Sequence, residues 1–178
     1  MPSSGWPAYW VMNEEYFDEV NVNNDVMGPR TRTEIHRLAL RHRAAHILVY
    51  NQRGQLFLQK RAPGKECFPN TWDASVSGHV QSGESYLDCA QREAQEELGL
   101  VPTEPLEKLF EVDACPETGM EFLWVYRTHS EGPFMLQADE ISDGQWFATD
   151  HVALWMRERP QDFAGAMPLI WNLLYPPE

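Results

Sequence analysis

Apolar, β-branched stretches along the chain predict most of its strands. The segment 42–50, HRAAHILVY, is largely apolar, and the polar sequence Asn-Gln-Arg-Gly at 51–54 separates it from a second run at 55–61. Two such runs joined by a short glycine-containing turn are typical of a β-hairpin. Further strands are predicted at 16–22, 73–80, 106–112, 121–128, 134–137 and 145–147.

Helical signals are strongest between Ser85 and Gly99. Ser85 followed three residues later by Asp88 resembles the capping box that starts many helices. Gly99 suits the left-handed position just after a helix end. The apolar residues of one side of this helix are Tyr86, Leu87, Cys89, Ala90 and Ala94.

The order of the predicted elements indicates the fold class. A short helix or turn is expected at 33–40, and the segment 150–174 is expected to be helical with a break at Pro160. Strands followed by a helix, further strands and more helices predict an α/β fold, an α/β/α sandwich around a mixed β-sheet. The 178 residues fit a single domain spanning 1–178, in which the segment 1–12 is expected to be loosely ordered.

The helix at 85–99 and the loop before it carry a dense pattern of acids and glycines. The stretch 78–100 has the form G-x5-E-x7-R-E-u-x-E-E-x-G-u, where u is apolar, and its fixed residues are Gly78, Glu84, Arg92, Glu93, Glu96, Glu97 and Gly99. On a helix, Glu93, Glu96 and Glu97 lie on adjacent turns of one face, where like charges repel. A hard divalent cation such as Mg²⁺, which prefers oxygen ligands, offsets this repulsion.

This pattern is the signature of the Nudix hydrolases, which the chain therefore resembles. The resemblance implies a Nudix fold with a catalytic loop–helix–loop and an enzyme that uses Mg²⁺, or Mn²⁺, to hydrolyse a diphosphate linkage. Arg92 is expected to orient the acids by pairing with Glu84 or Glu93. The implied metal ligands are Glu93, Glu96, Glu97 and the backbone carbonyl of Ser77.

A further acid outside this stretch often completes the site of the family. Glu140 lies six residues before Trp146 and matches that position, with Asp139 as the alternative. The resemblance implies that Glu140 binds metal or positions the attacking water. The sequence does not decide which acid is the general base.

A broader resemblance, over roughly residues 17–150, is to the branch that includes type I isopentenyl diphosphate isomerase and its hydrolase relatives. In those isomerases the positions of Arg61 and Lys65 grip the diphosphate, so both residues are expected to bind substrate. The isomerase has a catalytic cysteine before the Gly-His that opens the 78–100 stretch, and here Ser77 stands at that position. Because a hydroxyl is far less acidic than a thiol, this difference disfavours isomerase activity.

Histidines raise a separate question about metal binding. The isomerases hold a metal with three histidines and two glutamates, and His42, His79 and Glu121 fall on matching positions. Gly119 replaces one glutamate, and His36 is one residue out of register for the third histidine. Whether His42, His79 and Glu121 form a second metal site is left open.

Composition limits the partners and the compartment. The net charge is −13 and the pI about 4.8, which argues against binding to nucleic acid or to an anionic membrane. Three widely spaced cysteines, without a C-x-x-C pair, favour reduced thiols and a cytoplasmic location. No apolar stretch approaches the ~20 residues of a membrane span.

These observations predict an enzyme, a Mg²⁺-dependent Nudix hydrolase that acts on a small-molecule diphosphate. The substrate is expected to be a nucleoside di- or triphosphate or a related nucleoside-diphosphate-X compound, and family habit suggests a homodimer. The alternatives are an isomerase-like enzyme and a non-catalytic nucleotide-binding module. His46, which lies within an apolar strand, is expected to be a hydrogen-bonded core histidine.

Overall fold

The computed structural model describes residues 14–176, so the expectation for 1–12 lies outside the described residues. The helices are α1 (Arg32–Arg37), α2 (Tyr86–Leu98), α3 (Thr149–Glu158) and α4 (Met167–Leu174), with 3-10 turns η1 (Pro116–Thr118) and η2 (Pro160–Asp162). The strands are β1 (Tyr16–Val20), β2 (Val26–Thr31), β3 (His42–Tyr50), β4 (Leu56–Arg61), β5 (Trp72–Asp73), β6 (Val76–His79), β7 (Glu107–Val112), β8 (Glu121–His129) and β9 (Ile141–Phe147).

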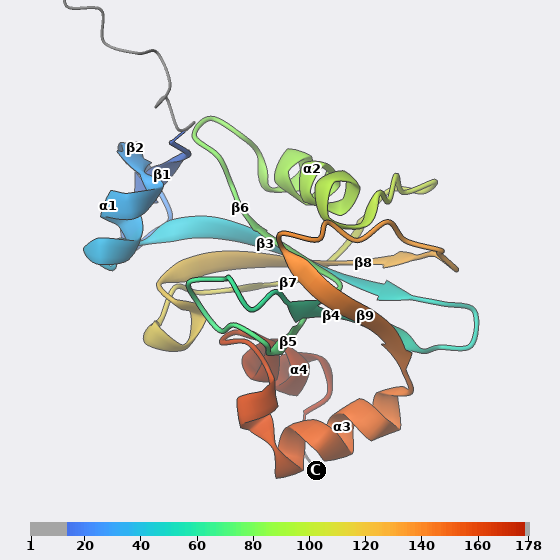
Figure 1. The fold of residues 1–178 in the computed structure, drawn as a ribbon. Coiled ribbons are helices and arrows are strands. Elements are labelled where there is room, and N and C mark those ends of the chain that lie inside the picture. The colour runs from blue at the N-terminus through green and yellow to red at the C-terminus, as the bar shows by residue number, and fades with distance from the viewer. Residues whose placement is uncertain (1–13, 177–178) are drawn as a thin grey trace, which may run out of the picture.

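A mixed sheet of seven strands lies at the centre of the described chain. Its main path is β5-β4-β3-β8-β7, with β6 beside β3 and β9 beside β4. β3 and β8 run parallel, and the other paired strands are antiparallel. α2 covers one face of the sheet, while α3 and α4 lie on the other (Figure 1). The predicted α/β fold with helices on both faces of a mixed sheet is confirmed.

β3 is buried on both faces because its side chains alternate between two cores. Ala44 and Leu48 belong to the core that includes residues of α3 and α4. Ala45, Ile47 and Val49 belong to the core that includes residues of α2. Alternation along a strand sends neighbouring side chains to opposite faces. Packing on both faces therefore fixes the position of β3 and of the polar residues that it also carries.

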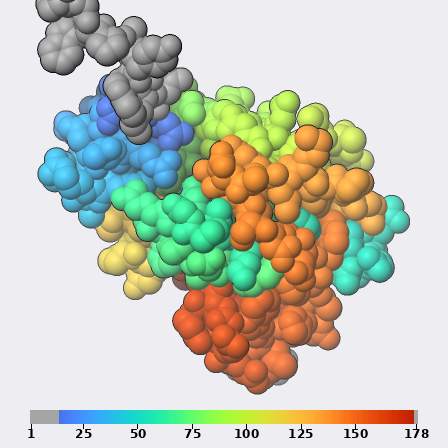
Figure 2. Space-filling model, in the orientation of Figure 1, coloured from blue at the N-terminus to red at the C-terminus, as the bar shows by residue number. Residues whose placement is uncertain are grey.

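A small two-stranded sheet, β1 and β2, steadies the loop that leads into α2. Phe17 forms an isolated bridge with Gln81, and the Ser82 amide donates to the carbonyl of Tyr16 at 2.8 Å. The carboxylate of Asp18 accepts from the Ser82 hydroxyl and from the Gly83 amide. Figure 2 shows this N-terminal region in blue against the rest of the molecule. The loop is thus held at both its backbone and its side chains.

α2 begins and ends where the sequence predicts. The Ser85 hydroxyl accepts a hydrogen bond from the Asp88 amide at 3.1 Å, as an N-cap does. Gly99 has φ +62°, in the left-handed region, and its amide bonds back into the last turn. The loop–helix–loop implied by the motif is therefore present.

Two predicted strands differ from the structure. The segment 73–80 forms two short strands, β5 and β6, in place of one. The segment 134–137 is not a strand, because its amides bond to the end of α2: Met135 donates to the carbonyl of Leu98, and Gln137 to that of Glu97. A local apolar pattern cannot show that the partner of a segment is a helix terminus.

Strand β2 is missing from the sequence prediction, and β9 is longer than predicted. β2 contains Gly28 and Pro29, which are typical of turns. It pairs only with β1, and an edge strand tolerates a proline that lacks an amide donor. β9 begins at Ile141, before the predicted strand 145–147, and runs through the Asp143-Gly144 pair. Glycine is required at position 144, because a Cβ there would lie 2.4 Å from the ring of Phe57.

Candidate active site

α2 brings one acidic side chain of the motif into the protein interior. Glu97 is 5% exposed, and its Oε2 accepts hydrogen bonds from Gln59 Nε2 at 2.9 Å and from the Ser77 amide at 3.1 Å. The donors come from β4 and β6, so the carboxylate is fixed between the helix and the sheet. Glu93 is half-buried one turn earlier, and Glu96 is more open to solvent.

Gly78 is required by the position of Glu93. A Cβ at residue 78 would lie 2.1 Å from Cδ of Glu93 and 2.3 Å from its Cγ. Such distances are far below van der Waals contact, so any side chain at 78 displaces the Glu93 carboxylate. The first glycine of the motif therefore makes room for one of its acids.

Arg92 ties the acids of the motif to one another and to the loop. Its guanidinium donates to both carboxylate oxygens of Glu84, at 2.8 and 2.9 Å, and to Glu93 at 2.5 Å. It also reaches Glu96 at 3.3 Å and the carbonyl of His79 at 3.1 Å. The sequence left open whether Arg92 pairs with Glu84 or Glu93, and the structure brings it to both. A planar guanidinium suits this fork of contacts.

Burial disfavours the charged forms of two acids of the motif. Burial raises the pKa of Glu93 to about 7, although Arg92 opposes the shift. Burial also raises the pKa of Glu97 well above its usual value, and the nearby Glu93 adds to the effect. Desolvated carboxylates are stabilised by a bound cation. The donor set of Glu93, Glu96 and Glu97 therefore fits a hard divalent metal ion.

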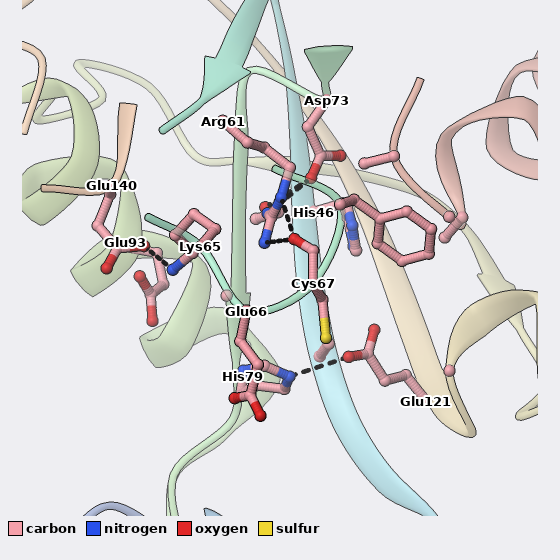
Figure 3. A pocket seen from close by; sticks show the side chains of 18 of the residues that line it. His46, Arg61, Lys65, Glu66, Cys67, Asp73, His79, Glu93, Glu121 and Glu140 are labelled. Atoms are coloured by element: carbon pink, nitrogen blue, oxygen red, sulfur yellow. Dashed lines mark hydrogen bonds and ion pairs between the residues drawn. The ribbon is translucent and has the colours of Figure 1, made fainter. Parts of the chain in front are cut away.

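A cavity of about 330 Å³ opens in front of these acids (Figure 3). The three motif glutamates and Ser77 line it, together with Arg61, Lys65 and Glu140. The cavity thus brings together all the sequence-predicted site residues except Arg92, which lies behind the acids and contacts them. Because these residues come from separate parts of the chain, only the fold places them at one site.

The two predicted substrate-binding cations are already engaged within the protein. Arg61 donates to Asp73 Oδ2 at 3.2 Å and to the carbonyl of Cys67 at 3.0 and 3.1 Å. Lys65 forms an ion pair with Glu140. These contacts connect the loop between β4 and β5 to Asp73 and to Glu140. Both cations line the cavity.

Three histidines and a glutamate form a second cluster, of which His36, His79 and Glu121 line the same cavity. The nearest ligand nitrogens of His36, His42 and His79 lie within 4.8 Å of one another. Glu121 Oε1 is 2.9 Å from Nε2 of His79 and 3.5 Å from Nε2 of His42. Nε2 of His42 is buried and has no hydrogen-bond partner among the described residues.

The pKa values of His36, His79 and Glu121 are shifted in directions that suit a metal. Burial lowers the pKa of His36 to about 4, and the neighbouring His79 and His42 lower it further. Burial likewise lowers the pKa of His79. Burial alone would raise the pKa of Glu121, but the neighbouring His42 and His79 hold it below the usual range. Neutral imidazoles and an ionised carboxylate are the forms that bind metals.

His36 was out of register in the sequence comparison, yet the structure brings it into the cluster. It comes from α1, whereas His42 opens β3 and His79 ends β6. The register pairs His42 with Glu121 on β8. The helix N-cap Thr31 and the buried Ile35 fix the orientation of α1, which a linear register does not capture. The sequence signal for this cluster was the match of His42, His79 and Glu121 to the metal positions of the isomerases.

His46 is not the hydrogen-bonded core histidine that the sequence predicts. It is 5% exposed, and its Nδ1 is buried without a hydrogen-bond partner among residues 14–176. It also lines the cavity (Figure 3). The expectation was wrong because β3 is flanked here by a cavity and not by a continuous apolar core.

A mixed sheet between helical layers, with a loop–helix–loop that carries three carboxylates to a cavity, defines a Nudix fold. The model of the NUDIX domain family matches residues 40–165, and the chain belongs to this family. An uncharacterized Nudix hydrolase from Yersinia pestis is 37% identical over 158 residues, covering 87% of this chain and 85% of that protein. The Nudix hydrolase YfcD of Escherichia coli K12 is 36% identical, with 87% and 86% covered.

Solved structures give the same result. The structure of DR0079 from Deinococcus radiodurans has a TM-score of 0.79 and 31% identity, covering 90% of this chain and 99% of that one. The NUDIX domain of Shewanella oneidensis NrtR, solved with ADP ribose, has a TM-score of 0.60 at 16% identity and covers 82% and 97%; it supports the fold alone. The prediction of an enzyme, a Nudix hydrolase, is confirmed by this family membership, and the narrower resemblance to the isomerase branch stays a prediction.

Proposed function

We propose that this protein is a Mg²⁺-dependent hydrolase of a diphosphate linkage. The substrate class is a nucleoside di- or triphosphate or a related nucleoside-diphosphate-X compound. The observation that carries the proposal is the buried carboxylate of Glu97 and the half-buried one of Glu93, beside Glu96 at the wall of the cavity. Membership of a family that generally uses divalent metals on small-molecule substrates supports it.

The metal would be held by the acids of α2. Glu93, Glu96 and Glu97 would bind it with the backbone carbonyl of Ser77, and Mn²⁺ could replace Mg²⁺. When bound, the cation supplies Lewis acidity that neutralises charge on the bridging and leaving phosphate oxygens. Arg92 acts as a positioning residue, since it fixes Glu84 and Glu93 through three hydrogen bonds.

Glu140 is proposed as the group that accepts a proton from the attacking water. The water oxygen forms the new bond to phosphorus, the bridging oxygen leaves with the other phosphate, and the proton passes to the carboxylate. Glu140 is paired with Lys65, and a substrate phosphate competes for that ammonium group. Arg61 would bind the same diphosphate with the N–H groups that Asp73 and Cys67 leave free.

The test is metal-dependent release of phosphate or pyrophosphate from a panel of nucleotides, nucleotide sugars, dinucleotides and isopentenyl diphosphate. Each is assayed with Mg²⁺ or Mn²⁺, beside the Glu97→Gln variant and the exposed control Glu104→Gln. Glu97→Gln is expected to lower kcat by about 100-fold or more while the fold persists, because an anionic ligand is replaced by a neutral one. The control is expected to keep the wild-type rate.

Other outcomes would change the assignment. A Glu97→Gln variant that keeps its rate under Mg²⁺ would contradict the metal site. Interconversion of isoprenoid diphosphates without phosphate release would favour the isomerase, although the Ser77 hydroxyl that replaces the isomerase thiol already donates to Asp73 at 3.3 Å. Tight nucleotide binding without turnover would favour a non-catalytic module.

The second cluster is the observation that favours an additional metal centre. We propose that His36, His42, His79 and Glu121 hold a transition-metal ion, because imidazole-rich sites prefer such ions to Mg²⁺. The unpartnered Nε2 of His42 supports this proposal, since a buried polar atom without a partner lowers stability.

Other predictions about the whole protein remain proposals. Among the described residues, none of the helices combines the length and the apolar character needed to cross a membrane. We keep a cytoplasmic location, a single domain over 1–178, a homodimer and the absence of a nucleic-acid partner as predictions from composition and family resemblance.

A further inference from the structure

The cavity continues beyond the acids of α2 to a wall on the opposite face of the sheet. His46 lies two residues from Ala44 and two from Leu48, and alternation along β3 turns all three to the face covered by α3 and α4. Ala44 and His46 both line the cavity. The register pairs His46 with Ser77 on β6, which places the two side chains next to each other.

Three polar side chains form this wall, which we call the polar wall: His46, Asp73 and Ser77. Figure 3 labels His46 and Asp73. Asp73 and Ser77 are satisfied within the protein. Asp73 accepts from Arg61 at 3.2 Å and from the Ser77 hydroxyl at 3.3 Å. Small residues also line the cavity: Gly119, Ala164, Gly165 and Ala166. Next to the polar wall, the cavity therefore leaves room for a polar group of a ligand to come into close contact with it.

His46 is the member of the polar wall that lacks a partner. Its Nδ1 is buried and forms no hydrogen bond with the described residues, and its neighbours Ala45 and Ile47 are apolar. A buried polar atom without a partner lowers stability, and an apolar residue would pack at this position without that loss. The histidine therefore serves the protein poorly as a core residue, and its ring lines the cavity, which points to a role in binding there.

On the basis of the proposed function, we propose that His46 is a specificity-determining residue that hydrogen-bonds a hydroxyl of the sugar in the X group of the substrate. A neutral imidazole offers one donor and one acceptor, and a hydroxyl can meet either. The acids of α2 and Lys65 meet the diphosphate, while the polar wall receives the group attached to it. A site built to bond a hydroxyl discriminates strongly against analogues that lack one.

The test compares sugar-bearing diphosphates with an alkyl diphosphate, isopentenyl diphosphate, that has no hydroxyl. The variants are His46→Phe, which removes both hydrogen-bonding atoms, and His46→Gln, which keeps a donor and an acceptor. His129→Asn, at an exposed histidine on β8, is the control. In His46→Phe the ratio of kcat/KM for the sugar compound to that for the alkyl compound is expected to fall about 10- to 100-fold. His46→Gln is expected to lose less, and the control to keep the ratio.

Thermal unfolding separates this role from a structural one. Because the wild-type nitrogen has no partner, His46→Phe is expected to unfold at the same or a higher temperature. An unchanged ratio in both variants would overturn the proposal, as would a lower unfolding temperature with equal loss on both substrates.

Direct binding keeps this proposal distinct from the hydrolase assignment. If the wild-type protein releases phosphate from none of the compounds, the hydrolase proposal fails, and calorimetric titration with a nucleotide sugar still tests His46. Weaker binding by His46→Phe, with partial recovery in His46→Gln, would support the polar wall. Equal affinity of the wild-type protein and both variants would overturn it.

Discussion

At the scale of single residues, the first glycine of the motif makes the sharpest prediction. In Gly78→Ala, the new Cβ would lie 2.1 Å from Cδ of Glu93, so the carboxylate must move away from its site. We expect kcat to fall about 100-fold or more with little change in unfolding temperature, because the displaced group is a side chain and not backbone. Steady-state kinetics with Mg²⁺ and a thermal melt measure the two effects.

Gly64 provides the matched control for that substitution. A Cβ at residue 64 would meet nothing within 4 Å, and its φ is not in the left-handed region. Gly64→Ala is therefore expected to keep the wild-type rate. Equal activity of the two alanine variants would mean that the position of the Glu93 carboxylate is unimportant for turnover.

The candidate site was only partly predictable at this scale. The spacing of Glu93, Glu96 and Glu97 predicts one acidic face, because helix geometry relates residues three and four apart. The same local logic fails for His36 and His46. Their significance depends on which strands and helices lie beside them, and sequence spacing does not contain that information.

At the scale of elements, the N-cap of α2 can be tested separately from the chemistry. The Ser85 hydroxyl accepts from the Asp88 amide at 3.1 Å. Ser85→Ala removes this bond and is expected to lower the free energy of unfolding by about 1 kcal/mol. Denaturant unfolding measures the loss, and Ser142→Ala, at an exposed position in β9, serves as the control. A loss no larger than that of the control would show that the cap contributes little.

The loop between β4 and β5 makes a functional prediction. Lys65 pairs with Glu140 and is proposed to bind the diphosphate. Lys65→Gln removes the charge but keeps hydrogen-bonding atoms, so KM is expected to rise about 10-fold or more, in line with the loss of one charged hydrogen bond. Lys60→Gln is the control, since Lys60 lies over the ring of Trp72. Unchanged KM in Lys65→Gln would assign Lys65 to loop structure alone.

Elements were predicted well where their signals are local and poorly where they depend on partners. α2 has its cap, its apolar side and its terminal glycine in its own sequence, and it was placed correctly. β2 was missed because Gly28 and Pro29 suggest a turn, and only pairing with β1 at an edge makes them a strand. The segment 134–137 looked like a strand, but its amides bond to the end of α2.

At the scale of the whole molecule, one cavity joins two clusters of different chemistry. The acids of α2 offer oxygen ligands suited to Mg²⁺, which keeps several of its water ligands when protein carboxylates bind it. The cluster of His36, His42, His79 and Glu121 offers three imidazole nitrogens and one carboxylate oxygen, which favour a transition metal. Arg92 links the two because it bonds both to Glu93 and to the carbonyl of His79.

This arrangement predicts that the two metals can be removed independently. After dialysis into metal-free buffer, the wild-type protein is expected to retain about one transition-metal ion per chain, which elemental analysis detects. His36→Gln and His42→Gln are expected to lose that ion, whereas Glu97→Gln keeps it and loses only Mg²⁺-dependent turnover. A chelator should lower the unfolding temperature of the wild-type protein and of Glu97→Gln, but not of the histidine variants, since only a bound ion stabilises the fold. Retention of equal metal by the histidine variants, or of none by the wild-type protein, would contradict the second centre and leave the acids of α2 as the one proposed metal site of the described chain.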